Sequence, residues 1–397
     1  MRLLFVTGLT ERAFSGAQRE TEQLIHAMVD REHEVGLASD RLTGPAEAVE
    51  HFPMPYPPRA RSFRERLSAI VPRFQPDVVH VLGGGLRVLQ AVHAAVGHTR
   101  PWITTIHSIP PYERTGRWGH SHNALYYRTR NLASLPSAML WRAHLGTASF
   151  TRAICHSPFV VNAAQHAGCP RQKLVEIPLG YDPAMERTNG EQTPTAQADD
   201  PCLFEPSDEP RLLSVGGLLH HKGFHDYLRV VAKLVRDHPR LRYVIMGDPR
   251  DARYRHALQR MIDRLRLHDH VRLVPKATEA QRLATAARAD LYIVPSHEEG
   301  FCLSYLEGAM LTPRALGTRC GVIDQIAQDD PAQEVVAPMN PHALEQATRR
   351  LLALPVSPDQ LAQRRAALRE RFTWHVHAEA HADLYHELAG VPVPMPV

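Results

Sequence analysis

Two glutamates, Glu299 and Glu307, stand beside a glycine turn in a stretch whose residue types could bind a sugar or a phosphate. The apolar run 291–294 before them predicts a short buried strand, and the apolar residues after Gly300 predict the start of a helix. Such a helix N-terminus presents unpaired N–H groups and partial positive charge, which favour a phosphate or a sugar hydroxyl. Because eight residues make about two helical turns, we expect both carboxylates to face a similar side, as acceptors for sugar or ribose hydroxyls. A solvated acidic loop followed by a surface helix is the alternative interpretation.

A histidine lies at a comparable place in the N-terminal half. Residues 102–106 predict a strand, and His107 follows at its C-terminal end. Ligands of open α/β sheets gather at the carboxyl ends of the strands, so His107 is placed to face a ligand. A loop histidine with a structural role is an equally good interpretation of this position.

The length and composition of the chain limit the classes of protein to which it can belong. A length of 397 residues predicts two domains, and the net charge of +4 gives no argument for nucleic acid. The five Cys include no Cys-x-x-Cys pair, which favours reduced thiols in a cytoplasmic protein. His220-His221 and His375-x-His377 lack the further ligands of a metal site, so structural or surface roles are favoured. The apolar N-terminus is too short for a signal peptide, and no run approaches the roughly 18–20 apolar residues that cross a bilayer.

The same order of elements occurs twice along the chain. The first half begins with a predicted βαβ unit: a strand over 3–7, a glycine-bearing loop, a helix about 17–31 and a strand over 34–38. Such a unit favours a parallel sheet with helices on both faces. The loop lacks the Gly-x-Gly-x-x-Gly spacing, so NAD is not indicated. Residues 45–62, rich in Pro and Arg, are expected to be irregular. A second half of the same kind begins at 211, which predicts an α/β protein of two facing doubly wound domains with a ligand in the cleft between them.

The stretch around the two glutamates resembles a family signature. Residues 299–303 and 306–310 are similar to the Glu-Gly-Phe-Gly-Leu…Leu-Glu-Ala-Met sequence, with its Glu-x7-Glu pair, of the GT-B retaining glycosyltransferases of group 1, family four. Residues 215–223 resemble that family's Val-Gly-Arg-Leu…Lys-Gly, and residues 15–18 resemble its Gly-Gly-Ala-Glu. The resemblance covers nearly the whole chain.

This resemblance implies a domain organisation. Residues 1–183 are expected to form an N-terminal acceptor-binding domain of Rossmann-like topology, completed by a C-terminal helix about 373–390. Residues 184–210 are expected to form a linker, and 211–372 a C-terminal nucleotide-sugar-binding domain.

The resemblance also implies roles for single residues. Of the residues expected to be catalytic, His107 holds the donor sugar near the reacting carbon, Lys222 neutralises the diphosphate and Glu299 binds sugar hydroxyls. Glu307 is expected to bind the nucleotide ribose, and Gly16 to let the first loop approach the phosphates or the acceptor closely. The other expected donor-binding residues, three of them acting through backbone N–H groups, are Gly217, Gly300, Phe301, Cys302 and Leu303.

Two positions depart from the family pattern. Gly217 stands where the family has an Arg that partners Lys222 at the diphosphate, and Cys302 stands where Gly is usual. Losing a bidentate cation from a leaving-group site should lower the rate unless another Arg replaces it.

The sequence therefore predicts a retaining glycosyltransferase that moves a sugar from a nucleoside-diphosphate sugar, with UDP or GDP as the nucleotide, to a hydroxyl or other nucleophile. The acceptor is expected to be a small polar metabolite or a natural-product intermediate, and residues 110–145, rich in His, Arg and aromatic side chains, are expected to shape its site. No Asp-x-Asp motif stands in the expected place, so we expect neither a metal nor another cofactor in the chemistry.

The alternatives are a catalytically altered pseudo-enzyme or nucleotide-sugar binding protein, a polysaccharide or lipid-linked glycan as the acceptor, and a phosphorylase of similar architecture. We expect a cytoplasmic protein that binds neither nucleic acid nor a membrane. The sugar, the base, the acceptor and the oligomeric state stay open.

Overall fold

In the computed structural model, the chain forms two compact units. The first unit contains the described residues up to Gly180 and those from Phe372 onward, and the second runs from Tyr181 to Arg371. The residues described are 1–7, 16–45, 47–55, 60–83, 85–107, 145, 150–183, 185, 203–206 and 209–390.

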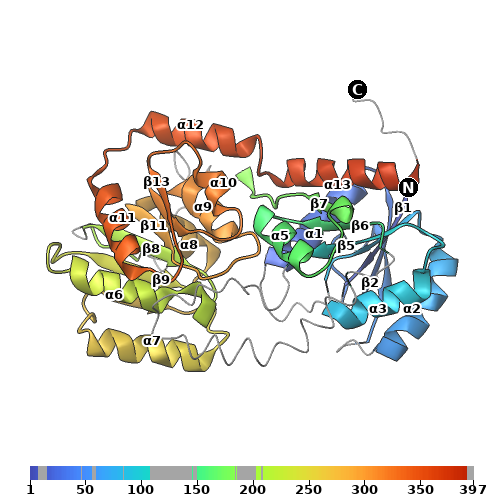
Figure 1. Cartoon of the computed structure of the whole chain (residues 1–397), viewed down its shortest axis with the longest axis horizontal. Helices are drawn as coiled ribbons and strands as arrows, with labels where there is room; N and C mark the ends of the chain where they lie inside the picture. The colour runs from blue at the N-terminus through green and yellow to red at the C-terminus, as the bar shows by residue number, and fades with distance from the viewer. Residues whose placement is uncertain are drawn as a thin grey trace. The chain divides into compact units, whose positions relative to one another are not determined.

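The first unit is a parallel sheet covered by helices (Figure 1). Its strand order is β3-β2-β1-β4-β5-β6-β7, and each described pairing is parallel. The strands are β1 (Arg2–Val6), β2 (Glu34–Ser39), β3 (Val49–Pro53), β4 (Val78–Val81), β5 (Trp102–Ile106), β6 (Arg152–Cys155) and β7 (Leu174–Glu176). The helices are α1 (Gly16–Asp30), α2 (Ala60–Phe74), α3 (Gly85–Val96), α5 (Pro158–His166), the short 3-10 helix Arg171–Lys173, and α13 (Trp374–Ala389).

Strand β1 shows why its apolar run folds in this way. A central strand of a parallel sheet is buried on both faces, so it carries apolar residues without alternation. Leu3 and Phe5 pack into one apolar core with residues of α1 and α13, whereas Leu4 and Val6 pack into the other with residues of α2 and α3. Successive side chains thus join the two helical layers to the sheet.

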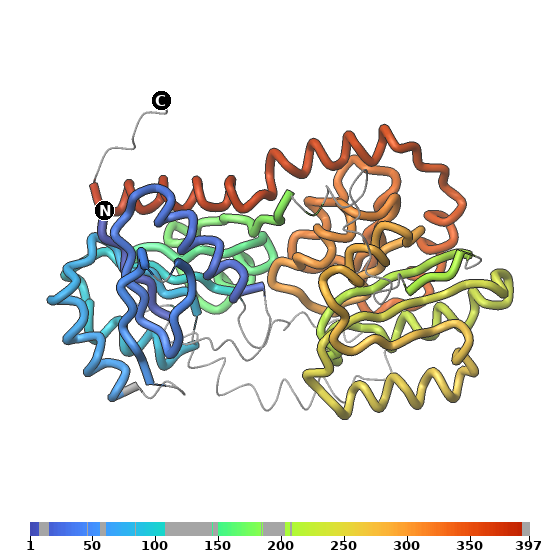
Figure 2. The backbone as a smooth tube through the Cα atoms, turned by 180° about the vertical axis from the view of Figure 1, so that it is seen from behind, coloured from blue at the N-terminus to red at the C-terminus, as the bar shows by residue number. Residues whose placement is uncertain are grey.

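Helix α13 returns to the first unit from the far end of the chain. Its N-cap is Thr373, whose side chain accepts a hydrogen bond from the N–H of Val376, and Gly390 ends it in the left-handed conformation. A Cβ at Gly180 would lie 2.2 Å from the backbone nitrogen of Trp374, so only glycine permits this approach. Figures 1 and 2 both show α13 beside the strands of the first unit.

The second unit repeats the architecture. Its strand order is β10-β9-β8-β11-β12-β13, again parallel. The strands are β8 (Arg211–Val215), β9 (Arg242–Met246), β10 (Val271–Val274), β11 (Leu291–Val294), β12 (Ala315–Thr318) and β13 (Gln333–Val336). The helices are the short 3-10 helix His220–Lys222, α6 (Phe224–Leu234), α7 (Ala252–Arg264), α8 (Glu279–Arg288), α9 (Leu303–Leu311), α10 (Ile323–Ala327), α11 (Pro341–Ala353) and α12 (Pro358–Arg369).

In both sheets the strand order changes direction beside the strand that comes first in the sequence, because later strands are added on its other side. The reversal falls between β1 and β4 in one sheet and between β8 and β11 in the other. Ligands of doubly wound sheets bind beyond the carboxyl ends of the strands at this point. The predicted Glu299 turn follows β11, and the Lys222 loop follows β8, so both lie at the reversal of the second sheet.

One expectation was wrong. Residues 45–62 contain strand β3 and the start of α2, where an irregular segment was expected. Among the described residues, β3 is an edge strand whose one pairing partner is β2. Only Val49 and Phe52 of its five residues are buried, so its own sequence gives a weak strand pattern. The predicted linker lies mostly outside the described residues, and the predicted cleft between facing domains stays a prediction.

Candidate active site

Lys222 and Glu299 form the charged centre of the second unit. Nζ of Lys222 donates to both carboxylate oxygens of Glu299, at 2.7 and 2.9 Å, and Oγ of Ser296 donates to Oε1 at 2.6 Å. The ammonium group belongs to the loop after β8 and the carboxylate to the loop after β11. The structure therefore brings together two predicted site residues that lie 77 positions apart.

The two loops are held against each other by backbone contacts. The N–H of His297 donates to the carbonyl of His221 at 2.6 Å. Gly223 has φ +68°, and a Cβ there would lie 1.9 Å from the carbonyl oxygen of Pro295, so glycine is required at this contact. This packing fixes the distance between the loop that carries Lys222 and the loop that carries Glu299.

Both members of this pair are charged. Burial raises the pKa of Glu299, but the Lys222 ammonium, His221 and hydrogen bonds from Lys222 and Ser296 together bring it below its ordinary value. Burial lowers the pKa of Lys222, but the Glu299 carboxylate brings it above its ordinary value. The site thus holds one positive and one negative charge that balance each other, so an anionic ligand would compete with Glu299 for Lys222.

Glu307 has a cationic partner that the sequence did not reveal. Nη1 of Arg282, on α8, donates to Oε2 of Glu307, on α9, at 2.6 Å, and both side chains are largely buried. Arg282 also pairs with Glu279, in its own helix. Burial lowers the pKa of Arg282, but Glu307 and Glu279 raise it above its ordinary value. Nothing in the local sequence marks Arg282, because its partner belongs to the next helix.

A second arginine lies at the glycine that departs from the family pattern. A Cβ at Gly217 would lie 3.7 Å from Cδ and 3.8 Å from Nε of Arg250. Arg250 follows β9, and its Nε lies 3.8 Å from Oδ2 of Asp248. The guanidinium group of Arg250 therefore lies beside the position from which an arginine at 217 would extend.

Cys302 is the N-cap residue of α9 and adopts φ 87° and ψ 60°, a left-handed conformation that favours glycine. Its side chain makes no capping hydrogen bond to the helix. Phe301 and Cys302 are buried, and Leu303 is the first residue of α9. The strand, glycine turn and helix start that the sequence predicted around Gly300 are confirmed.

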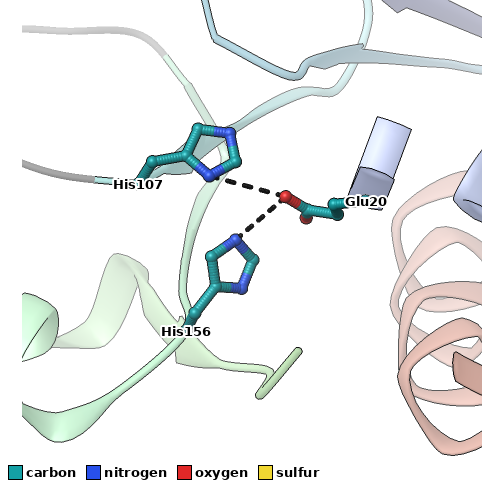
Figure 3. Close-up of side chains that lie close together, drawn as sticks. All are labelled: Glu20, His107 and His156. Carbon is teal, nitrogen blue, oxygen red and sulfur yellow. Dashed lines mark ion pairs between the residues drawn. The ribbon is translucent and has the colours of Figure 1, made fainter. Parts of the chain in front are cut away.

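The remaining predicted residues lie in the first unit. Gly16 is the first residue of α1, and His107 follows β5. Nδ1 of His107 lies 3.5 Å from Oε2 of Glu20, and its Nε2 lies 3.5 Å from the carbonyl oxygen of Leu82. Burial lowers the pKa of His107 more than Glu20 raises it, which leaves the ring neutral. Figure 3 shows His107 and His156 both pointing at Glu20. The predicted acceptor segment 110–145 lies, except for Leu145, outside the described residues.

Solved structures show that this fold is GT-B. Over 98% of this chain and 99% of that chain, it superposes on sucrose-phosphate synthase from Thermosynechococcus elongatus with a TM-score of 0.73 and 19% identity. Over 98% of this chain and 100% of that chain, it superposes on Anabaena HepE, solved in complex with UDP, with a TM-score of 0.69 and 15% identity. The predicted fold class is thereby confirmed.

Two family models cover successive parts of the chain. Residues 14–185 match the model of Glycosyltransferase Family 4, and residues 197–370 match that of Glycosyl transferases group 1. The chain belongs to this glycosyltransferase family. A curated relative, the D-inositol 3-phosphate glycosyltransferase of Kineococcus radiotolerans, is 31% identical over 232 residues, which are 55% of this chain and 52% of that protein. The chain thus spans about half the length of that relative. In the described part of the chain, no helix has the length and apolarity needed to cross a membrane.

Proposed function

We propose that the protein is a retaining glycosyltransferase that transfers a sugar from a nucleoside-diphosphate sugar, with UDP or GDP as the nucleotide, to a hydroxyl or other nucleophile of an acceptor. The observation that carries this proposal is the Lys222–Glu299 pair at the reversal point of the second sheet. A charge-balanced cation–carboxylate pair suits a donor that is itself both anionic and rich in hydroxyls. HepE, a structural neighbour, is solved with UDP.

Donor binding would redistribute the partners of this pair. The diphosphate replaces Glu299 as the partner of Lys222, and Glu299 then accepts hydrogen bonds from the sugar hydroxyls. Negative charge on the diphosphate grows as the glycosidic bond breaks, so Lys222 stabilises the transition state more than the ground state. Glu307 binds the ribose while Arg282 holds its carboxylate in place. The donor-binding roles that the family resemblance implies for Gly16 and His107 stay predictions.

Arg250 supplies the second cation at the diphosphate. Its guanidinium group lies beside Gly217, where the small residue leaves room for it. A planar guanidinium binds two phosphate oxygens at once, which an ammonium cannot do. With Arg250 in this role, the diphosphate has a second cation although position 217 lacks the arginine of the family pattern.

The acceptor is a small polar metabolite or a natural-product intermediate. The relative from Kineococcus radiotolerans is named for a small phosphorylated polyol, D-inositol 3-phosphate. The departing diphosphate takes the proton of the acceptor hydroxyl on the face that it leaves, so the sugar keeps its anomeric configuration. Lys222 and Arg250 balance the leaving-group charge, and no metal ion is required for this step.

The test is calorimetric binding of UDP, GDP, ADP and TDP to wild type and to Glu307→Gln. We expect one nucleotide to bind and the substitution to weaken it at least about tenfold, because the ribose loses a charged acceptor. The matched control is Glu345→Gln, which changes a glutamate of α11 that is paired with Lys233 of α6. If no nucleotide binds to wild type at millimolar concentration, the proposed donor site is refuted and the pseudo-enzyme hypothesis replaces the glycosyltransferase proposal. If one binds but no nucleoside-diphosphate sugar is turned over, a binding protein is the outcome.

A further inference from the structure

Glu20 is a fully buried carboxylate that lies among histidines. It belongs to α1, and its side chain has no exposed surface. His377 and His381, one turn apart on α13, are also buried, and Nε2 of His377 lies 3.6 Å from Oε1 of Glu20. Ligand atoms of Glu20, His377 and His381 all lie within 4.8 Å of one another.

The hydrogen bonds of the two histidines decide which nitrogen carries a proton. Nδ1 of His377 lies 2.7 Å from the carbonyl oxygen of Pro178, and Nδ1 of His381 lies 2.8 Å from that of His377. A carbonyl oxygen only accepts, so each Nδ1 must be the donor. In the neutral rings each Nε2 is then an acceptor, and neither has a hydrogen-bond partner among the described residues.

Three electron-pair donors thus converge in a buried space: Oε1 of Glu20 and the two Nε2 atoms. Oε1 also lacks a hydrogen-bond partner in the described chain. A proton on His377 would satisfy Oε1 but leave Nε2 of His381 without a partner. Protons on both rings would place two positive charges side by side, because the ring centroids are 4.2 Å apart. A cation placed between the three atoms satisfies them all.

The second carboxylate oxygen of Glu20, Oε2, does not require an ion. Nε2 of His156 lies 3.2 Å from Oε2 of Glu20, while Nδ1 of His156 donates to the carbonyl oxygen of Ile177 at 2.8 Å. One proton on His156 makes an ion pair there, and His107 faces the same oxygen at 3.5 Å. His80, which stacks on His381, bonds Tyr385 and Thr105 with its two ring nitrogens. A proton on His156 therefore satisfies Oε2 of Glu20, whereas Oε1 of Glu20 and the Nε2 atoms of His377 and His381 still lack partners in the described chain.

We propose that Glu20, His377 and His381 bind one divalent transition-metal ion of the zinc type. Ligand atoms of a tetrahedral zinc ion, at 2.0–2.1 Å from the metal, lie about 3.3 Å apart, close to the separation of Glu20 and His377. Metal-binding histidines usually donate the other ring N–H to a carbonyl or carboxylate, as both rings do here. Imidazole and carboxylate together favour zinc over calcium or magnesium.

The ion would fasten α13 to α1, which lies near the other end of the chain. Its role is structural, because its ligands are buried and none of them is assigned to sugar transfer. A comparison within the molecule supports the choice of site. His225, Asp226 and His297 also cluster, but His297 and Arg229 already satisfy Asp226, at 2.7 and 2.9 Å. That cluster needs no ion.

The experiment measures bound metal in the purified full chain by mass spectrometry, before and after chelation and reloading with Zn²⁺ or Co²⁺. Wild type should hold about one ion per chain, and the Co²⁺ form should show the intense visible absorption of tetrahedral cobalt. His381→Ala should lower the bound metal at least about tenfold. His375→Ala, on the same helix but exposed and paired with Glu379, should keep it.

Thermal unfolding provides a second measurement. Chelation should lower the Tm of wild type and of His375→Ala but leave that of His381→Ala unchanged, because a ligand bound only by the folded state stabilises it. A wild type that takes up no ion from either metal solution overturns the proposal and leaves a proton or a buried water between these groups. Equal metal in His381→Ala and His375→Ala overturns it as well.

Discussion

The two units each hold buried carboxylates, but the partners of these carboxylates differ. In the second unit, Glu299 is paired with Lys222 and Glu307 with Arg282, all at ordinary hydrogen-bond distances. In the part of the first unit that the structure describes, the charged-group partners of Glu20 are imidazole nitrogens, at 3.2 to 3.6 Å.

In the second unit each buried carboxylate therefore already has a cationic partner, whereas Glu20 in the first unit has imidazole partners at longer distances. The pairs of the second unit are balanced in charge, so a ligand must exchange partners with them. The carboxylate of the first unit is surrounded by imidazoles, and in our proposal a proton on His156 and a metal ion balance its charge.

Removing the cation of the balanced pair should affect the second unit most. We expect Lys222→Ala to lower kcat/KM by about 10²–10³, or about 2.7–4 kcal/mol, because the diphosphate loses its main cation as the bond breaks. Steady-state kinetics with the preferred donor provides the measurement. The control is Lys233→Ala, which removes a half-exposed lysine paired with Glu345. A loss below about threefold for Lys222→Ala would remove Lys222 from the mechanism.

A buried histidine in the second unit should make stability depend on pH even without an ion. Burial lowers the pKa of His225 to about 3, against the opposing effect of Asp226. The unfolded chain takes up this proton below its ordinary pKa of about 6.5 and the folded chain does not, so stability falls as pH drops below that value. At pH 5 the contribution is about 2 kcal/mol.

We therefore expect His225→Gln to reduce the loss in Tm between pH 7 and pH 5, as measured by calorimetry. His375→Gln, a change at an exposed histidine, should leave the loss as it is in wild type. An identical pH dependence for all three proteins would show that His225 is protonated in the folded state.

Moving a guanidinium group between two positions should have a smaller effect. Arg250→Ala should lower kcat/KM about tenfold, or about 1.4 kcal/mol, because Lys222 remains at the diphosphate. Gly217→Arg in the Arg250→Ala background should restore most of the rate, since the two side chains reach the same place. Arg253→Ala, which changes an exposed arginine of α7, is the control. No rescue by the second substitution, with native stability, would assign the diphosphate contact to another group.

The elements around the second site could be predicted because their signals are local. Each of these elements is specified by fewer than about ten consecutive residues: strand β11, the turn at Gly300 and helix α9. Within such a window, the spacing of apolar residues and the turn-forming residues indicate the local structure. The edge strand β3 could not be predicted in this way, because its pairing with β2 supplies what its own sequence lacks.

The side-chain partners needed the folded chain. Arg282 and Arg250 are two among many arginines, and only the packing of α8 on α9 and of the β9 loop on Gly217 selects them. The histidines of α13 also needed the folded chain. The sequence analysis considered His375 together with His377, whereas the helix places His377 and His381 on the same face.

By itself, the sequence determined the class of this protein. The repeated strand–loop–helix order indicates doubly wound domains, and the resemblance of the Glu-x7-Glu stretch to the family signature implies a GT-B glycosyltransferase, because both patterns lie in neighbouring residues of the chain. Only the tertiary structure decided which charges meet. Glu20 and His377 are separated by most of the chain and meet at 3.6 Å because α13 returns to the first sheet. Contacts of this range depend on how whole helices pack, which no local pattern of residues specifies.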